Sequence, residues 1–147
     1  MKILIATDGS EYSKAAVAAC SRMVIRPATE VLLVSAFEDA YPIMAEPFAV
    51  SAEYYQQVEN AVREQCIGFI DEAKRILSEK FPSDSLVVET EVLRGSPVQQ
   101  IVEKAKEWNA DLIVVGSHGR GFWGRLLGSV SDGVVHHAPC SVLVVRE

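Results

Sequence analysis

The feature that most constrains the fold is a regular alternation of short apolar runs with longer segments of helical periodicity. Four of these runs are almost unbroken, as is typical of strands buried on both faces of a sheet. They span residues 2–7 (KILIAT), 31–37 (VLLVSAF), 112–116 (LIVVG) and 142–145 (VLVV). A fifth run, 86–93 (LVVETEVL), alternates apolar residues with Glu89 and Glu91. That alternation predicts a strand near the sheet edge with one wetter face.

The segments between these runs repeat their apolar residues with the period of an α-helix. In the first, Ser10 is a suitable N-cap and Pro27 a stop signal, with Tyr12, Ala16, Ala19 and Met23 on one face. The second helix is predicted from about residue 53 to 80. Its apolar stripe consists of Tyr55, Val58, Val62, Cys66, Phe69, Ala73 and Ile76.

Two further helices are predicted in the second half of the chain. One begins at Ser96 as N-cap, with Pro97 at the first helical position and Gln99 completing a capping box. The other follows a glycine-rich stretch. Its apolar residues in helical phase are Leu126, Leu127, Val130 and Val134.

The resulting order of elements is βαβαβαβαβ. Strands that alternate with helices predict an open parallel sheet with helices on both faces, joined by right-handed crossovers. Residues 1–147 fit a single α/β domain of this kind. The stretch 38–52 contains two prolines and shows no clear period. It is either a flap over a binding site or a surface connection.

Charge and cysteine content restrict the class of partner. The formal net charge of -6 argues against broad contact with nucleic acid or an anionic membrane. A small anion held by helix ends and backbone amides stays possible. The apolar runs are far shorter than a membrane span. The three cysteines, Cys20, Cys66 and Cys140, form no C-x-x-C pair, which favours reduced thiols and a cytoplasmic location.

Five of the nine glycines gather in the stretch GSHGRGFWGRLLG, residues 116–128. Gly119, Gly121 and Gly124 match the G-x-G-x-x-G pattern of dinucleotide-binding proteins. That pattern, however, belongs after the first strand and needs an acidic residue about 20 positions later. Here it follows the fourth strand, where only Asp132 and Glu147 lie downstream. The pattern is therefore no evidence for NAD, and the chain contains no Gly-Lys-Ser/Thr of a P-loop either.

The ends of the first and fourth strands predict a shared site. Ligands of open parallel sheets bind at the carboxyl ends of strands, where the strand order reverses. The first strand ends in Thr7-Asp8-Gly9-Ser10 and the fourth in Gly116-Ser117-His118-Gly119. If these two strands are neighbours, Asp8 faces the glycine loop across a crevice. Amides of 117–121 and the Ser129 hydroxyl could then bind phosphates, and Asp8 a ribose hydroxyl or a metal ion.

The chain resembles the universal stress protein family along essentially its whole length. The resemblance lies in ILIATDGS at the start, GSHG after the fourth strand and LLGSVSDGVVHHAPCSVLVV at the end. It implies a five-stranded parallel sheet of order 3-2-1-4-5 and a homodimer paired through the last strand, residues 141–146. Members of the family with this glycine motif resemble ATP binders.

Carried over by motif, the resemblance places adenine near Ala6 and Ala36 and the phosphates at the glycine loop. ATP is the expected ligand, together with Mg²⁺ or Mn²⁺ that Asp8 could contact through the nucleotide. The expected ligand-binding residues are Ala6, Thr7, Asp8, Ala36, Gly116, Ser117, His118, Gly119, Arg120, Gly121, Gly128, Ser129, Val130 and Ser131.

The chain departs from the family pattern at one place. Between Gly119 and Gly128 stand eight residues, RGFWGRLL, where the family usually has nine. A residue lost inside a helix would turn everything after it by about 100°. A residue lost in the loop would be absorbed, and this is the alternative that we favour.

Several of these residues have structural explanations too. Asp8 could simply cap the first helix, and His118 could contribute its backbone amide without its ring taking part in catalysis. His136 and His137 suit a helix end better than a metal site, because adjacent helical residues diverge by about 100°. The leading function is an ATP-binding stress-response switch with slow or no hydrolysis. The alternatives are an interaction module without nucleotide and a weak ATPase.

Overall fold

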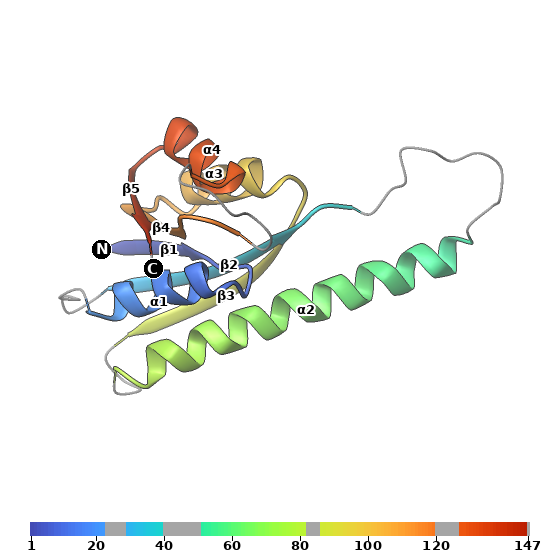
Figure 1. Cartoon of the computed structure of the whole chain (residues 1–147), viewed down its shortest axis with the longest axis horizontal. Coiled ribbons are helices and arrows are strands. Elements are labelled where there is room, and N and C mark those ends of the chain that lie inside the picture. The colour runs from blue at the N-terminus through green and yellow to red at the C-terminus, as the bar shows by residue number, and fades with distance from the viewer. Residues whose placement is uncertain (23–28, 40–50, 82–85, 120–126, 147) are drawn as a thin grey trace.

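The computed structural model describes residues 1–22, 29–39, 51–81, 86–119 and 127–146. Its centre is a five-stranded sheet in the order β3-β2-β1-β4-β5 (Figure 1). All neighbouring strands run parallel. The strands are β1 (Lys2–Ala6), β2 (Glu30–Phe37), β3 (Val87–Arg94), β4 (Leu112–Gly116) and β5 (Ser141–Val145). The α/β class and the strand order 3-2-1-4-5 expected from the sequence are confirmed.

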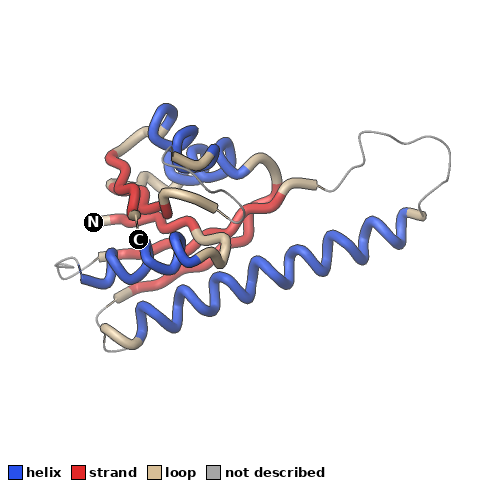
Figure 2. Tube along the Cα trace, in the orientation of Figure 1, coloured by secondary structure: helices blue, strands red, loops and turns tan. Residues whose placement is uncertain are grey.

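Four helices in the described part of the chain form two layers around this sheet (Figure 2). They are α1 (Glu11–Arg22), α2 (Ala52–Ser78), α3 (Pro97–Glu107) and α4 (Ser129–His137). The helices α1 and α2 cover one face, and α3 and α4 cover the other (Figure 1). Each face has its own apolar core, so β1 and β4 are buried on both sides.

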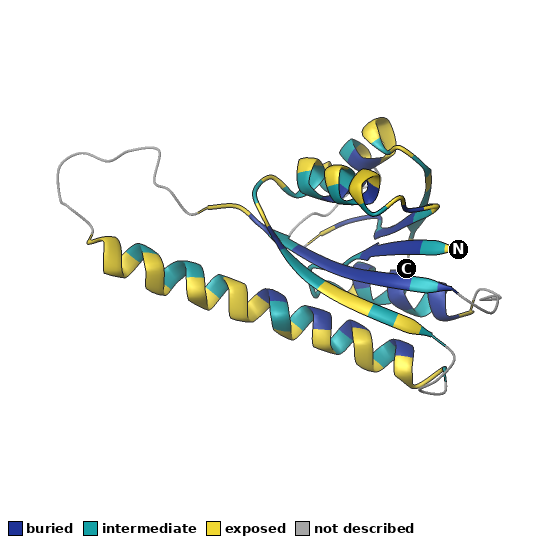
Figure 3. Ribbon diagram, turned by 180° about the vertical axis from the view of Figure 1, so that it is seen from behind, coloured by how far each residue is buried: buried dark blue, intermediate teal, exposed yellow. Residues whose placement is uncertain are grey.

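Burial falls from the central strands toward the periphery (Figure 3). Leu4, Ile5 and Leu33 on β1 and β2 are fully buried, which explains their nearly unbroken apolar sequences. Strand β3 pairs only with β2 in the sheet order, and Val87 at its start is 59% exposed. The predicted edge position of this strand is therefore confirmed. None of the described helices is both long and apolar enough to traverse a bilayer.

The first two helices begin close to where the sequence predicts. Ser10 caps α1, because the Ser13 amide donates to Ser10 Oγ at 3.2 Å. Helix α2 starts one residue before the predicted residue 53, and the Ser51 hydroxyl accepts a hydrogen bond from the Tyr54 amide at 3.3 Å. The predicted stop at Pro27 and most of the stretch 38–52 lie outside the described residues.

The starts of the last two helices correct two expectations. Pro97 opens α3 as predicted, but the Ser96 side chain makes no capping hydrogen bond. Gln99 Nε2 instead donates to Glu103 Oε1, one turn further along the helix, so the capping box is wrong. Helix α4 begins at Ser129 with Gly128 as its N-cap. Leu127 thus precedes the helix and does not belong to its apolar face, while Leu126 lies outside the described residues.

Candidate functional site

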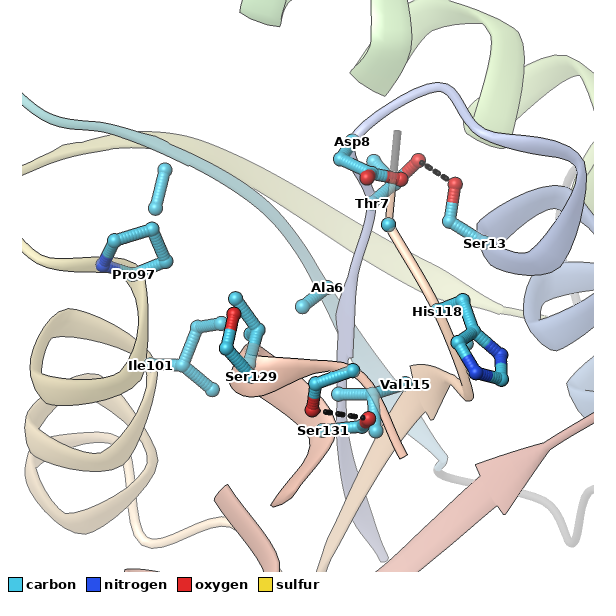
Figure 4. Close-up of a pocket in the computed structure, with 15 residues that line it drawn as sticks. Ala6, Thr7, Asp8, Ser13, Pro97, Ile101, Val115, His118, Ser129 and Ser131 are labelled. Atoms are coloured by element: carbon cyan, nitrogen blue, oxygen red, sulfur yellow. Dashed lines mark hydrogen bonds between the residues drawn. The ribbon is translucent and has the colours of Figure 1, made fainter. Parts of the chain in front are cut away.

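A cavity of about 410 Å³ opens at the carboxyl ends of β1 and β4. These two strands are adjacent and parallel, which places the cavity where the strand order reverses. Figure 4 shows side chains converging on it from several elements. Its walls are formed by Ala6, Thr7, Asp8, Ser13, Ala36, Pro97, Ile101, Val115, Gly116, His118, Gly119, Gly128, Ser129, Val130 and Ser131.

The turn after β1 holds Asp8 in a fixed orientation. Its Oδ1 atom accepts hydrogen bonds from the Ser10 amide at 3.1 Å and from the Ser10 hydroxyl at 2.6 Å. Its Oδ2 atom lies beside Gly119, 2.9 Å from where a Cβ would stand at that residue. Asp8 therefore does not cap α1 itself, because the capping oxygen belongs to Ser10. It fixes the Ser10 side chain and brings its second carboxylate oxygen to the glycine segment.

A pair of buried hydroxyl groups lies next to this turn. Thr7 Oγ1 and Ser13 Oγ are hydrogen-bonded at 3.1 Å (Figure 4). Ser13 Oγ also donates to the Ser10 carbonyl at 2.9 Å. Because Ser13 has a single hydroxyl proton, Thr7 is the donor in the shared bond when Ser13 donates to Ser10. The pair links the end of β1 to the first turn of α1 and lines the cavity.

The segment after β4 is joined to the start of α4 through the carbonyl of Ser117. This oxygen accepts hydrogen bonds from the Gly128 amide and from the Ser131 hydroxyl, both at 2.8 Å. Ser117 itself is fully buried and does not line the cavity. The first turn of α4 is thus fixed against β4, with Ser129 and Ser131 both at the cavity wall.

The start of α4 decides whether the shortened glycine segment affects the helix. Helix α4 begins only after Gly128, so the deviation in length between Gly119 and Gly128 falls before the helix. The helical phase of Ser129, Val130 and Ser131 is therefore unaffected by it. Arg120 and Gly121, the remaining two expected site residues, lie outside the described residues.

Gly116 has a packing role that was not predicted from the sequence. A Cβ atom at this position would lie 2.6 Å from the Tyr12 carbonyl carbon and 2.8 Å from the Ser13 amide nitrogen. The backbone of α1 therefore passes so close to the end of β4 that no side chain fits between them. Gly116 lines the cavity, yet close helix–strand packing already requires a glycine there.

The ring of His118 is directed toward the protein and not toward the open cavity. It packs against the Tyr12 ring with centroids 5.1 Å apart and planes inclined by 52°, and its Nδ1 atom is hydrogen-bonded to Ser117 Oγ at 3.0 Å. His118 is buried. This geometry agrees with a contribution through the backbone. His136 and His137 bond by Nδ1 to carbonyl oxygens one turn back, at the end of α4.

Four residues of the cavity wall were not predicted from the sequence. Ser13, Pro97, Ile101 and Val115 all line it. Pro97 and Ile101 lie on α3, one helical turn apart, although no motif pointed to this helix. Val115 precedes the glycines within β4, and Ser13 follows the Thr7–Ser10 turn. One signal was available in the sequence. Helix α3 connects β3 to β4, so in the sheet order β3-β2-β1-β4-β5 it has to cross over β2 and β1 near the site.

The polar part of the cavity wall includes the first turns of two helices, with Ser13 on α1 and Ser129 on α4. Free amides and the helix dipole at such ends attract negative charge. The opposite part of the wall is apolar, with Ala6, Ala36 and Ile101. The arrangement suits a ligand with an apolar flat group at one end and an anionic group at the other.

The model of the family described as "Universal stress protein family" matches residues 1–146. The chain belongs to the universal stress protein family. It is 34% identical over 146 residues to a universal stress protein of Thermus aquaticus, covering 98% of this chain and 97% of that protein. The resemblance stated from the sequence motifs is therefore confirmed at the level of the family.

Solved structures of other proteins share the fold. The UspA universal stress protein of Lactobacillus plantarum superposes with a TM-score of 0.82 at 23% identity, covering 99% of this chain and 97% of that one. A universal stress protein in complex with cAMP has a TM-score of 0.69 at 26% identity, with coverage of 99% and 96%. Some structural relatives of this chain thus bind nucleotides.

Proposed function

We propose that this universal stress protein binds ATP and acts as a nucleotide-dependent switch in a stress response, with slow or no hydrolysis. The observation that carries the proposal is the cavity of about 410 Å³ at the ends of β1 and β4. Its volume lies in the ordinary range of small-molecule sites. Its wall changes from apolar residues on one side to hydroxyl groups, glycines and one carboxylate on the other.

The polar side of the cavity supports binding of the phosphates. Gly119 leaves the backbone open to a close approach, and Ser129 lies at the start of α4. A side chain at Gly119 would approach Asp8 Oδ2 to 2.9 Å and would occupy space that a phosphate needs. Helix ends and backbone amides bind such anions without requiring net positive charge.

Asp8 fits a nucleotide-bound Mg²⁺ or Mn²⁺ because one carboxylate oxygen is held by Ser10 and the other faces the glycine segment. Within the described residues, no group of three or more His, Cys, Asp or Glu side chains could hold a metal ion. Asp8 would therefore share the ion with phosphate oxygens and water, the ligand set that Mg²⁺ usually takes. The ion would supply neutralisation of phosphate charge next to the carboxylate.

A switch is favoured over a dedicated hydrolase by the placement of the Ser117–His118 pair. The two side chains are hydrogen-bonded at 3.0 Å, as a nucleophile and its base would be. Ser117, however, is fully buried and does not contribute to the cavity wall, and the His118 ring packs against Tyr12. This pair is not placed to attack a bound phosphate.

Titration calorimetry of the purified protein tests the proposal, with ATP, ADP, AMP and NAD as ligands and with and without Mg²⁺. Binding of ATP with little affinity for NAD is expected. Phosphate release measured on the same samples should be slow or absent. Failure to bind any adenine nucleotide at millimolar concentration would favour the interaction module, and fast phosphate release would favour the ATPase.

A further inference from the structure

Helix α3 forms one wall of the cavity, although none of the glycine motifs predicts its involvement. Pro97 and Ile101 lie four residues apart, on the same face of the helix. Ile101 is only 3% exposed and belongs to the apolar cluster that Ala6 and Ala36 pack against. The cavity is therefore bounded on this side by a buried branched side chain above two alanines of the sheet.

The two ends of the cavity differ in chemistry. In Figure 4, Pro97 and Ile101 lie across the cavity from Thr7 and Asp8, with Ala6 between them. The side chains of Ala6, Pro97 and Ile101 offer no hydrogen-bonding atom. A ligand group at this end is therefore selected by its shape and by the ease with which it leaves water. A flat aromatic base meets both conditions.

The position of Ile101 is stiffly defined. A β-branched side chain inside a helix has one strongly preferred χ1 rotamer, and Pro97 sets the backbone angle at the first residue of α3. Further along α3, the Lys104 ammonium group forms an ion pair with Glu91 of β3 at 3.0 Å. Ile101 and Ala105 are also buried in the apolar cluster that packs on the sheet, so this face of α3 cannot easily retreat from a larger ligand.

We propose that Ile101 is a specificity-determining residue that limits the size of the base admitted between α3 and Ala6–Ala36. The proposal rests on the proposed nucleotide binding and adds to it the side chain that selects the base. Its consequence is that a smaller residue at position 101 admits substituted bases that the wild-type protein excludes.

The test compares wild type with Ile101→Ala and Ile101→Val in calorimetric titrations. The ligands are ATP and three derivatives that carry a benzyl group on N6, a bromine on C8 or a methylthio group on C2. We compare the ratio of the affinity for each derivative to the affinity for ATP. For at least one derivative, this ratio should rise about tenfold in Ile101→Ala, a change typical of adding or removing a small apolar group in a pocket. Ile101→Val, which loses a single methylene group, should shift the same ratio in the same direction by less.

Two controls separate base selection from loss of stability and from loss of phosphate contacts. Ile70→Ala removes an equally buried isoleucine (4% exposed) from α2, which packs in the core on the other face of the sheet. It should leave the ratio unchanged although it also destabilises the fold. Asp8→Ala should weaken ATP and its derivatives by the same factor and also leave the ratio unchanged.

The outcomes distinguish this inference from the proposed function. Wild type that binds ATP, combined with an unchanged ratio in Ile101→Ala for all three derivatives, overturns the role of Ile101 alone. Wild type that binds neither ATP nor the derivatives overturns the proposed nucleotide binding, and the role of Ile101 with it. A rise of the ratio in Ile70→Ala as large as that in Ile101→Ala also overturns the inference.

Discussion

The Oδ2 atom of Asp8 lies 2.9 Å from the point where a Cβ atom would stand at Gly119. The two residues come from the ends of different strands, 111 positions apart in the sequence (119 − 8). The contact brings the sequence-predicted carboxylate and the glycine segment together at one cavity. It also makes Gly119 a residue at which any side chain changes the site directly.

We expect Gly119→Val to abolish ATP binding while the protein stays folded. The valine side chain would enter the cavity between Asp8 and the start of α4. The protein should stay folded because the atom that the new Cβ approaches, Asp8 Oδ2, is the end of a side chain and not part of the backbone. Calorimetry should show at least about a tenfold loss of affinity, equivalent to about 1.4 kcal/mol. Gly68→Ala on α2, where an added Cβ meets nothing within 4 Å, is the matched control and should bind as wild type does. Equal binding by Gly119→Val would mean that the site is misplaced.

Asp8→Ala is expected to weaken binding of ATP by about 1–3 kcal/mol, the range for hydrogen bonds to charged groups. The loss should be larger with Mg²⁺ present if the carboxylate contacts a nucleotide-bound ion. Asp39→Ala removes the same charge from an exposed residue that lies outside this cavity. Calorimetry of the two variants separates a local contact from a change in net charge, since equal effects would exclude a direct role of Asp8.

Gly116→Ala should destabilise the fold by about 1–3 kcal/mol, the usual cost of overpacking. The added methyl group would lie 2.6–2.8 Å from backbone atoms of Tyr12 and Ser13, so α1 would have to move away from β4. Urea unfolding monitored by circular dichroism measures the change. Gly68→Ala on the exposed surface of α2 should instead be neutral or stabilising by up to about 1 kcal/mol. A wild-type midpoint for Gly116→Ala would contradict the packing role.

We predict a homodimer formed through β5. This strand pairs only with β4 in the sheet order, and Val142, Leu143, Val144 and Val145 are all partly exposed. An apolar edge strand of this kind is a template for pairing with a second chain. Light scattering should give twice the chain mass of 16.1 kDa. Leu143→Lys should yield monomers, while Val87→Lys at the opposite sheet edge should not. A wild-type protein that is monomeric at tens of micromolar would refute the dimer.

Burial raises the pKa of the Cys20 thiol to about 11, from an ordinary value of 9.0. The folded protein therefore holds this proton more tightly than the unfolded chain. The resulting stability is fully present below pH 9 and is lost as the pH rises from 9 toward 11. Urea unfolding at pH 8 and pH 10 should show this loss in wild type. Cys20→Ala should lose less stability over the same interval, and an equal loss would mean that other groups cause it.

Much of the fold was predictable because its signals are local. The apolar runs of β1, β2 and β4 lie in strands buried on both faces, and alternation with Glu89 and Glu91 correctly indicated an edge strand. The starts of α3 and α4 were less predictable. Ser96 has the residue type of a cap but makes no side-chain capping bond, and Leu127 matches the helical phase although the helix begins two residues later. Local patterns cannot decide between geometries whose energies differ little.

The sequence by itself determined the parallel α/β architecture and the strand ends that carry Asp8 and the glycines, because these follow from periodicity. That β1 and β4 are neighbours was implied by the resemblance to universal stress proteins, and the structure confirms it. Only the tertiary structure decided that Gly116 is needed for the packing of α1, that the His118 ring packs against Tyr12, and that Ile101 closes the cavity from α3. Each depends on how close two distant elements approach, and that distance is set by side-chain packing across the whole sheet.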